Sequence, residues 1–183
     1  INHELPSLEP QKFHDYQMSF VGYSGSGKTT LIEKLVSRFS EAYRVGYVKR
    51  DAHGFQMDKE GKDTYRVKQK GARKVFINHR EASCAMIGAS EPLNGNIFDD
   101  CDMVLVEGYK ESPFEKIAVL DQPGELLKRI QAGDVKNVQA YVCDDPIEGL
   151  DKPCFKRDDV DGIFDFINQA FETIRESVSL KAL

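Results

Sequence analysis

Near the start of the chain stands the stretch Gly22-Tyr23-Ser24-Gly25-Ser26-Gly27-Lys28-Thr29, which fits the pattern G-x-x-x-x-G-K-[ST]. A strand-like apolar run over 16–21 precedes it, and apolar residues at helical spacing follow it. Glycines let the backbone curl so that successive N–H groups point inward, and the start of the following helix adds its positive end. The stretch therefore predicts a phosphate-binding loop (the P-loop) for a nucleoside triphosphate.

The side chains of the P-loop have separate expected roles. We expect Lys28 to reach the β- and γ-phosphates and to act in catalysis, and we expect the Thr29 hydroxyl to bind Mg²⁺. The residues expected to contact the nucleotide here are Ser24, Gly25, Ser26, Gly27, Lys28, Thr29 and Thr30.

A P-loop also needs a carboxylate near its metal ion, normally at the carboxyl end of a neighbouring buried strand. Glu107 ends the apolar run 103–106, and Asp51 follows the run 45–48 after two basic residues. We expect both carboxylates to lie in the metal shell with Thr29, and one of them to orient the attacking water. For each, the alternative is a carboxylate that only opens a loop.

The order of apolar segments predicts an α/β fold of the P-loop NTPase class, with a mostly parallel sheet of about seven strands and helices on both faces. One helix should begin at Lys28, a second should run over 63–71, and the last should start after 158–159. The expected strands are 16–21, 45–48, 75–77, 84–87, 103–106, 117–120 and 138–142.

Length and composition limit the classes of protein further. With 183 residues, of which 40% are hydrophobic, the chain should form one domain over 16–183 after a flexible leader over 1–15. A net charge of −5 argues against general nucleic-acid binding, which needs an excess of basic residues. Apolar runs such as 103–106 are too short for a membrane helix, and no signal peptide is visible, so we expect a cytoplasmic protein without a membrane partner.

Four cysteines offer no recognisable pattern of pairing or metal binding. They form no C-x-x-C pair and no Cys/His spacing of a zinc site, so we expect reduced, buried thiols. A metal-delivery GTPase would be expected to show a Cys or His cluster, and none is visible. The cysteines are Cys84, Cys101, Cys143 and Cys154.

Three further segments accompany the P-loop: Lys49-Arg50-Asp51-Ala52-His53-Gly54-Phe55, Asp58-Lys59-Glu60-Gly61-Lys62-Asp63-Thr64-Tyr65 and Val106-Glu107-Gly108-Tyr109-Lys110. With the P-loop, this combination resembles the MobB family, the molybdopterin-guanine dinucleotide biosynthesis protein B. The likeness covers most of 16–178. In that family the segment after the second strand is typically rich in histidine, whereas this chain has Arg50 and Ala52 at two of those positions and keeps only His53.

The resemblance implies a homodimeric GTP-binding protein of molybdenum cofactor maturation. It implies GTP and Mg²⁺ as ligands, with molybdopterin as a further ligand, and a guanylyltransferase partner, MobA, that joins GMP to molybdopterin. Because no residue resembles an arginine finger or a strong general base, we expect slow Mg²⁺-dependent GTP hydrolysis. The residues that the family segments offer for substrate or partner contacts are Lys49, His53, Asp58, Lys62, Asp63, Tyr65 and Lys110.

The sequence lacks the common guanine motif Asn-Lys-x-Asp, and the resemblance points instead to the end of the last strand, 141–146. There Asp144 is the expected guanine reader, because the two oxygens of a carboxylate face the N1–H and N2–H₂ donors of guanine, while adenine offers no such pair. The alternative is an aspartate that forms a turn before Pro146.

A local run of six basic residues without an acid predicts either a solvated helix face or a docking surface for an anionic partner or a pterin phosphate. Two other functions remain open beside the slow GTPase: a nucleotide-gated adaptor with negligible turnover, and a P-loop small-molecule kinase with arginines of this run as its lid. The six residues are Arg66, Lys68, Lys70, Arg73, Lys74 and Arg80.

Overall fold

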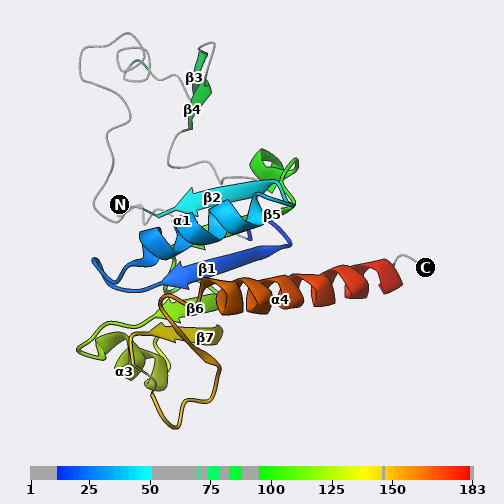
Figure 1. Cartoon of the computed structure of the whole chain (residues 1–183). Coiled ribbons are helices and arrows are strands. Elements are labelled where there is room, and N and C mark those ends of the chain that lie inside the picture. The colour runs from blue at the N-terminus through cyan, green and yellow to red at the C-terminus, as the bar shows by residue number, and fades with distance from the viewer. Residues whose placement is uncertain are drawn as a thin grey trace, which may run out of the picture. The chain divides into compact units, whose positions relative to one another are not determined.

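The computed structural model describes residues 12–50, 70, 74–78, 83–87, 95–145 and 147–181, the side chains of 74, 76–78, 83–87, 95–96 and 176–181 excepted. The chain divides into two compact units. The larger comprises residues 11–50 and 94–183, and the other includes residues 51–93 (Figure 1).

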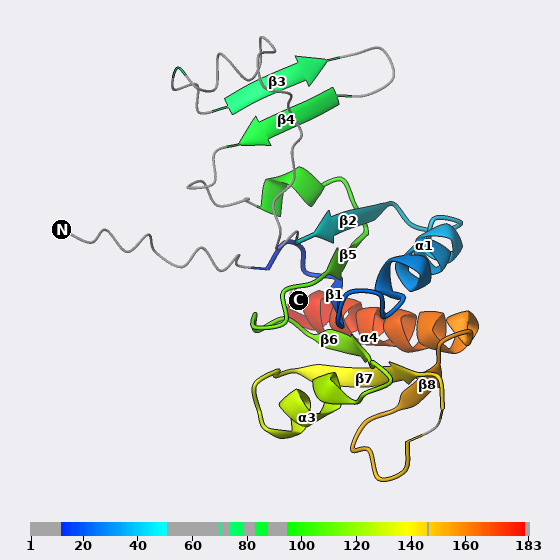
Figure 2. The ribbon, with the colours of Figure 1, turned by 90° about the vertical axis from the view of Figure 1, so that its left-hand side faces the viewer.

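The larger unit is built on a six-stranded sheet in which every neighbouring pair of strands is parallel. Its spatial order is β2-β5-β1-β6-β7-β8, which can be followed in Figure 2. The predicted parallel α/β fold is confirmed, with six strands in this sheet instead of about seven. The strands are β1 (Gln17–Val21), β2 (Val45–Lys49), β5 (Met103–Glu107), β6 (Lys116–Val119), β7 (Val138–Cys143) and β8 (Cys154–Lys156).

Two of the predicted strands lie elsewhere. β3 (Lys74–Asn78) and β4 (Ser83–Ile87) pair antiparallel in a two-stranded sheet of the other unit. The physical reason is the connection, since only four residues separate these strands and a parallel pairing needs a crossover of a dozen or more. The sixth strand of the large sheet is β8, whose three residues are too few to produce an alternating pattern.

Three α-helices cover the large sheet: α1 (Lys28–Phe39), α3 (Glu125–Gln131) and α4 (Val160–Lys181). A short 3₁₀ helix, η1, spans Gly95–Phe98. The starts of the first and last helices agree with prediction, whereas the sequence analysis missed α3. The predicted helix over 63–71 lies outside the described residues. Among the helices that are described, none combines the length and apolar character that a bilayer crossing requires.

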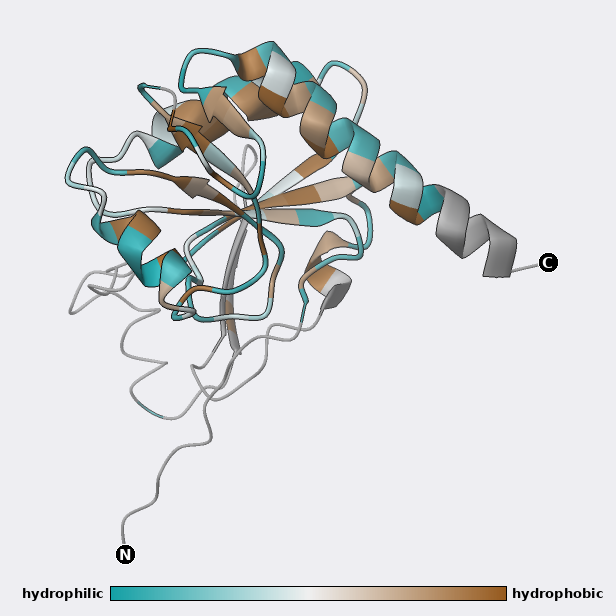
Figure 3. Ribbon diagram, turned by 90° about the horizontal axis from the view of Figure 1, so that it is seen from below, coloured by the Kyte–Doolittle hydropathy of each residue, from teal (hydrophilic) through white to brown (hydrophobic). Residues whose placement is uncertain are grey.

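Apolar side chains on both faces of the sheet form the core. On one face, α1 and α4 pack together over β1, β5, β6 and β7, and the rings of Phe39 and Phe164 lie 4.4 Å apart. On the other face, Leu126 of α3 packs with Val21, Leu120 and Tyr141. Figure 3 shows hydrophobic residues concentrated on the strands, and bands of hydrophobic and hydrophilic residues alternating along the helices. Helices on both faces of the sheet were predicted, and this is confirmed.

Phe13 belongs to the folded part of the chain although it lies in the segment predicted as a leader. Its side chain is 1% exposed and packs against Phe98, Tyr109 and Phe114. Its backbone N–H donates to Gln17 Oε1 at 2.7 Å. Residues 1–11 lie outside the described part of the chain, so a leader there stays a prediction.

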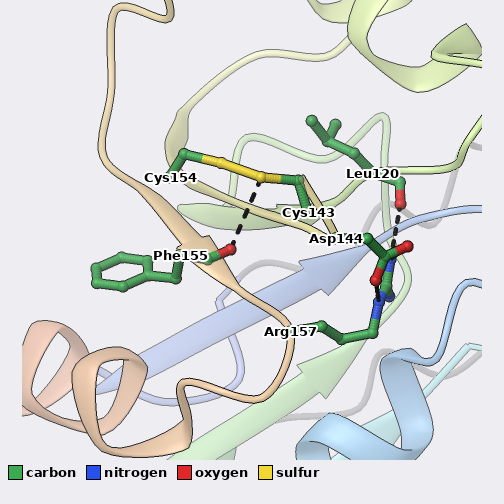
Figure 4. The surroundings of a disulfide bond; sticks show 6 residues. All are labelled: Leu120, Cys143, Asp144, Cys154, Phe155 and Arg157. Carbon is green, nitrogen blue, oxygen red and sulfur yellow. Dashed lines mark hydrogen bonds and ion pairs between the residues drawn. A yellow bond between two sulfur atoms is a disulfide. The ribbon is translucent and has the colours of Figure 1, made fainter. Parts of the chain in front are cut away.

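Two of the four cysteines differ from the expectation of reduced thiols. Cys143 and Cys154 form a disulfide between β7 and β8 (Figure 4). Cys101 is a free thiol. Cys154 lies opposite Tyr141 in the register of β7 and β8, and Cys143 follows two residues later on the same face. Strand pairing therefore brings together two cysteines whose spacing along the sequence carries no signal.

Lys116, at the start of β6, is fully buried. Its ammonium group donates to the backbone carbonyls of Ser112 at 2.6 Å, Phe114 at 2.7 Å and Lys136 at 3.1 Å. The side chain thus joins the loop before β6 to the loop before β7, and supplies the hydrogen-bond donor that buried carbonyls require.

Replacing Lys116 with Met keeps the length of the side chain but leaves these carbonyls without that donor. We expect Lys116→Met to lower the free energy of unfolding by about 2–4 kcal/mol, measured by urea denaturation. The control is Lys136→Met, at an exposed lysine in the loop before β7, with an expected change within about 0.5 kcal/mol. Equal stabilities of the two variants would contradict this role for Lys116.

Candidate functional site

The P-loop connects β1 to α1 at the carboxyl edge of the parallel sheet, where ligands of such sheets collect. Gly25 and Gly27 have φ values of 76° and 82°, in the left-handed region that glycine adopts without strain. Gly27 is the N-cap of α1, and its carbonyl accepts the N–H of Leu31 at 3.0 Å. The curled backbone and the helix start that the sequence predicts are therefore both present.

Gly22 is required for a different reason, which is close packing. A Cβ atom at this position would lie 2.6 Å from Ser26 Oγ and 2.7 Å from the backbone carbonyl oxygen of Val119. Val119 belongs to β6, next to β1 in the sheet, so its carbonyl has little freedom to move. The loop can therefore fold back against the sheet only if residue 22 has no side chain.

Lys28 lies against the P-loop itself. Its ammonium group donates to the carbonyl of Tyr23 at 2.7 Å and to Ser26 Oγ at 3.4 Å. Burial lowers the pKa of Lys28, the charge of Glu107 opposes that shift, and the positive charges of Lys110 and Lys49 add to it. An anion in the loop would relieve this repulsion, so the group suits a phosphate ligand.

Glu107 lies at the end of β5 and is only 6% exposed. Thr29 Oγ1 donates to its two carboxylate oxygens at 3.1 Å and 3.0 Å. The phenol of Tyr47, on the adjacent strand β2, donates to Oε2 at 2.8 Å, and Lys49 Nζ lies 3.9 Å from Oε1. The predicted pairing of Thr29 with Glu107 at one point of the sheet edge is present.

Tyr47 is a site residue that the sequence analysis missed. Burial raises the pKa of its phenol, and the hydrogen bond to the Glu107 carboxylate raises it further, so the phenol stays a donor at neutral pH. The only available signal for Tyr47 was the alternation of buried and exposed residues along β2. Gly46 and Val48 are buried, while Tyr47 and Lys49 are exposed.

The oxygens of Thr29 and Glu107 fit a magnesium ion, which takes part of its coordination shell from phosphate and water. They fit less well a metal whose ligands all come from the protein. Mg²⁺ prefers oxygen ligands and usually takes one or two protein groups together with phosphate oxygens and water. Thr29 and Glu107 provide a hydroxyl and a carboxylate beside the phosphate loop. Within the residues that the structure describes, no three His, Cys, Asp or Glu side chains gather as a ready-made metal cage.

Lys49 and Lys110 lie on the same side of the site as Lys28, whose pKa both of them lower. Lys110 also stacks on the ring of Tyr23, with Nζ 4.2 Å from the ring centroid. Arg50 stacks on the ring of Tyr109, and its Nη1 lies 3.6 Å from Glu111 Oε2.

Several predicted residues lie outside the described part of the chain, so their roles stay predictions. The side chain of Lys74 is also outside the description. Lys70 is described, but the residues on either side of it are not. Thr30 is exposed on the first turn of α1. The predicted residues outside the description are Asp51, His53, Asp58, Lys62, Asp63, Tyr65, Arg66, Lys68, Arg73 and Arg80.

A cavity of about 370 Å³ opens on the other side of the P-loop. It is lined by P-loop residues 24–27, by the segment 120–123 after β6, and by Asp144 and Arg157. Asp144 follows β7 directly and its side chain is 49% exposed. The predicted base-reading carboxylate therefore borders a cavity that begins at the phosphate loop.

Arg157, which follows β8, is the second site residue that the sequence analysis missed. Its Nε donates to Asp144 Oδ1 at 2.7 Å, and its Nη2 donates to the carbonyl of Leu120 at 3.1 Å (Figure 4). Its Nη1 donates to the carbonyl of Ser26 in the P-loop. The hydrogen bond from Arg157, with its positive charge, lowers the pKa of Asp144. Arg157 was missed because β8, the strand that places it at the sheet edge, was not predicted.

Comparison with known proteins agrees with this geometry. A family model described as MobB, molybdopterin guanine dinucleotide synthesis protein B, matches residues 17–144. The chain belongs to the MobB family. The match runs from the first residue of β1 to Asp144, so it spans the P-loop, Glu107 and the residue that borders the cavity. The resemblance inferred from the sequence motifs is thereby confirmed.

Relatives and solved structures extend the match over most of the chain. The molybdopterin-guanine dinucleotide biosynthesis adapter protein of Haemophilus influenzae is 36% identical over 157 residues, which are 82% of this chain and 86% of the relative. Its counterpart in Escherichia coli is 30% identical, over 82% of this chain and 90% of the relative. A solved molybdopterin-guanine biosynthesis protein B superposes with a TM-score of 0.65 at 31% identity, over 84% of this chain and 99% of that one. For Bacillus subtilis MobB the TM-score is 0.66 at 26% identity, over 84% and 96%.

The packing around Gly22 leads to a direct test of the loop geometry. Because a new Cβ would strike the Val119 carbonyl, we expect Gly22→Ala to lower the free energy of unfolding by about 1–3 kcal/mol in urea denaturation. Ser24→Ala, at an exposed position of the same loop, is the control and should leave stability within about 0.5 kcal/mol of the parent. A Gly22→Ala protein as stable as the parent would show that the loop does not fold back as described.

Proposed function

We propose that this MobB-family protein binds GTP with Mg²⁺ in its P-loop and assists the attachment of GMP to molybdopterin. The observation that carries the proposal is the contact between the Thr29 hydroxyl and the buried Glu107 carboxylate, directly beside a loop that presents backbone N–H groups and the Lys28 ammonium. These are the groups that a Mg²⁺–triphosphate complex needs, and they come from the loop and helix that follow β1 and from the end of the neighbouring strand β5.

The preference for guanine rests on Asp144 in this proposal. A nucleotide whose phosphates lie in the P-loop extends into the cavity lined by residues 24–27, 120–123, Asp144 and Arg157. A carboxylate can accept both N1–H and N2–H₂ of guanine, whereas adenine presents an acceptor at N1. The position of Asp144 beside this cavity supports it as the base reader.

Hydrolysis in this proposal is an in-line attack of water on the γ-phosphate. Bound Mg²⁺ would supply positive charge to the phosphate oxygens. Lys28 stabilises the developing negative charge, and Glu107, held by Thr29 and Tyr47, orients the water. We propose that Asp51 either positions the same water or lies in the metal shell.

Turnover should be slow because the arginine that contacts the P-loop, Arg157, is engaged by protein groups. Arg157 contacts the P-loop, but it donates to the carbonyls of Ser26 and Leu120 and to Asp144. An arginine that neutralises transition-state charge accounts for a large part of fast hydrolysis in P-loop enzymes. A slow enzyme of this kind works best as a nucleotide-dependent adapter, and the relatives carry the word adapter in their names.

We further propose that the protein acts as a homodimer, in the cytoplasm, beside the guanylyltransferase MobA. Lys49 and Lys110 beside the P-loop offer positive charge to an anionic substrate such as the phosphate of molybdopterin.

Lys28→Ala tests nucleotide binding directly. We expect it to weaken binding of fluorescent GTP in the presence of Mg²⁺ by about a hundredfold or more, because a buried charge-assisted contact to two phosphates is lost. Lys34→Ala, at an exposed lysine on the same helix, should bind like the parent protein. If Lys28→Ala bound GTP as tightly as Lys34→Ala, the P-loop would not be the nucleotide site.

Adding purified guanylyltransferase separates a gated adapter from an independent enzyme. The isolated protein should release inorganic phosphate from GTP at well under one turnover per second, and the partner should raise that rate at least tenfold. Radiolabelled GTP also tests the kinase alternative, since a kinase would transfer the label to a small molecule. Turnover at tens per second without a partner, or transfer of the label, would contradict the proposal.

A further inference from the structure

The guanidinium group of Arg157 occupies the carboxylate edge of Asp144. Nε donates to Oδ1 at 2.7 Å and Nη2 lies 3.4 Å from Oδ2, so two adjacent N–H groups face the two oxygens of one carboxylate (Figure 4). With the bonds to the carbonyls of Ser26 and Leu120, four of the five N–H donors of the side chain are engaged.

This arrangement has the same chemistry as the recognition of guanine by a carboxylate. The N1, C2 and N2 atoms of guanine form a guanidine-like unit that presents N1–H and N2–H side by side. A carboxylate binds either group through the same pair of oxygens, because both deliver two parallel donors. Arg157 and guanine therefore need the same edge of Asp144 and cannot both hold it.

We propose that Arg157 is a specificity-determining residue, an internal competitor that holds the base-reading edge of Asp144 until a base with two adjacent donors replaces it. This inference rests on the proposed function, because it assumes that a nucleotide places its base beside Asp144. It adds a residue that reads no base itself and yet limits the preference for guanine, because it competes with guanine for the carboxylate.

The exchange is balanced for guanine and unfavourable for adenine. When guanine replaces the guanidinium, the Asp144 carboxylate keeps two hydrogen bonds. Arg157 keeps its carbonyl partners Ser26 and Leu120, and its charge stays beside the loop that holds the phosphates. Adenine has no donor at N1 and would leave the carboxylate with an unmatched acceptor, so adenine leaves the ion pair in place and gains nothing when the pair is removed.

The opposite role for Arg157, a support that positions Asp144 for guanine, predicts an effect of opposite sign. Removing a competitor strengthens guanine binding, whereas removing a support weakens it. Loss of the bonds to Ser26 and Leu120 acts on the phosphate loop and changes the affinities for GTP and ATP together. The ratio of the two affinities therefore isolates the contact with Asp144.

The test is Arg157→Met, with dissociation constants for GTP and ATP measured with Mg²⁺ by displacement of one fluorescent nucleotide. Because the Arg157–Asp144 pair is partly exposed, we expect its removal to raise the preference for GTP over ATP by about three- to fivefold. Lys156→Met, which removes an exposed charge one residue away, should leave the ratio unchanged. An unchanged or smaller ratio in Arg157→Met would overturn the inference.

Two further variants keep the result interpretable. Arg157→Lys retains the charge but cannot present two parallel donors, so it should also raise the ratio, and it serves if Arg157→Met does not fold. In an Asp144→Asn background, Arg157→Met should leave the ratio unchanged, because the contested carboxylate is gone. If the parent protein bound neither nucleotide, the proposed function would fail; if it bound both and the ratio did not rise, only this inference would fail.

Discussion

The hydrogen bonds between the Thr29 hydroxyl and the Glu107 carboxylate connect the phosphate loop to the neighbouring buried strand. Thr29 lies in the first turn of the helix after β1, and Glu107 ends β5, which pairs with β1 in parallel register. Their meeting depends on parallel pairing, because only then do the ends of both strands lie at one edge of the sheet. Tyr47, from the next strand, completes the arrangement at the same carboxylate.

The base side of the site depends on the same sheet edge. Leu120 follows β6 and Asp144 follows β7. Arg157, which follows β8, contacts both of them and the P-loop. A nucleotide that lies along this edge would meet phosphate-binding groups at one end and a carboxylate at the other. The site is thus a consequence of strand order, which brings together residues more than a hundred positions apart in the sequence.

The sequence allowed prediction of the features whose signals are local. The P-loop, the start of α1 at Lys28 and the buried β5 with Glu107 at its end each follow from spacing and hydrophobicity within a few residues. The contacts of Tyr47 and Arg157, the pairing of Cys143 with Cys154, and the separate β3–β4 hairpin were not predicted. Each depends on which strands lie side by side, and that information is absent from local patterns.

A crystal structure with a non-hydrolysable GTP analogue and Mn²⁺ in place of Mg²⁺ tests the central claim most directly, because anomalous scattering locates the metal. We expect phosphates within hydrogen-bonding distance of the backbone N–H groups of residues 24–29 and of Lys28 Nζ. We also expect the metal bonded to Thr29 Oγ1, with Glu107 in its shell directly or through water. An empty loop, or a metal bound away from Thr29 and Glu107 in a protein saturated with nucleotide, would contradict it.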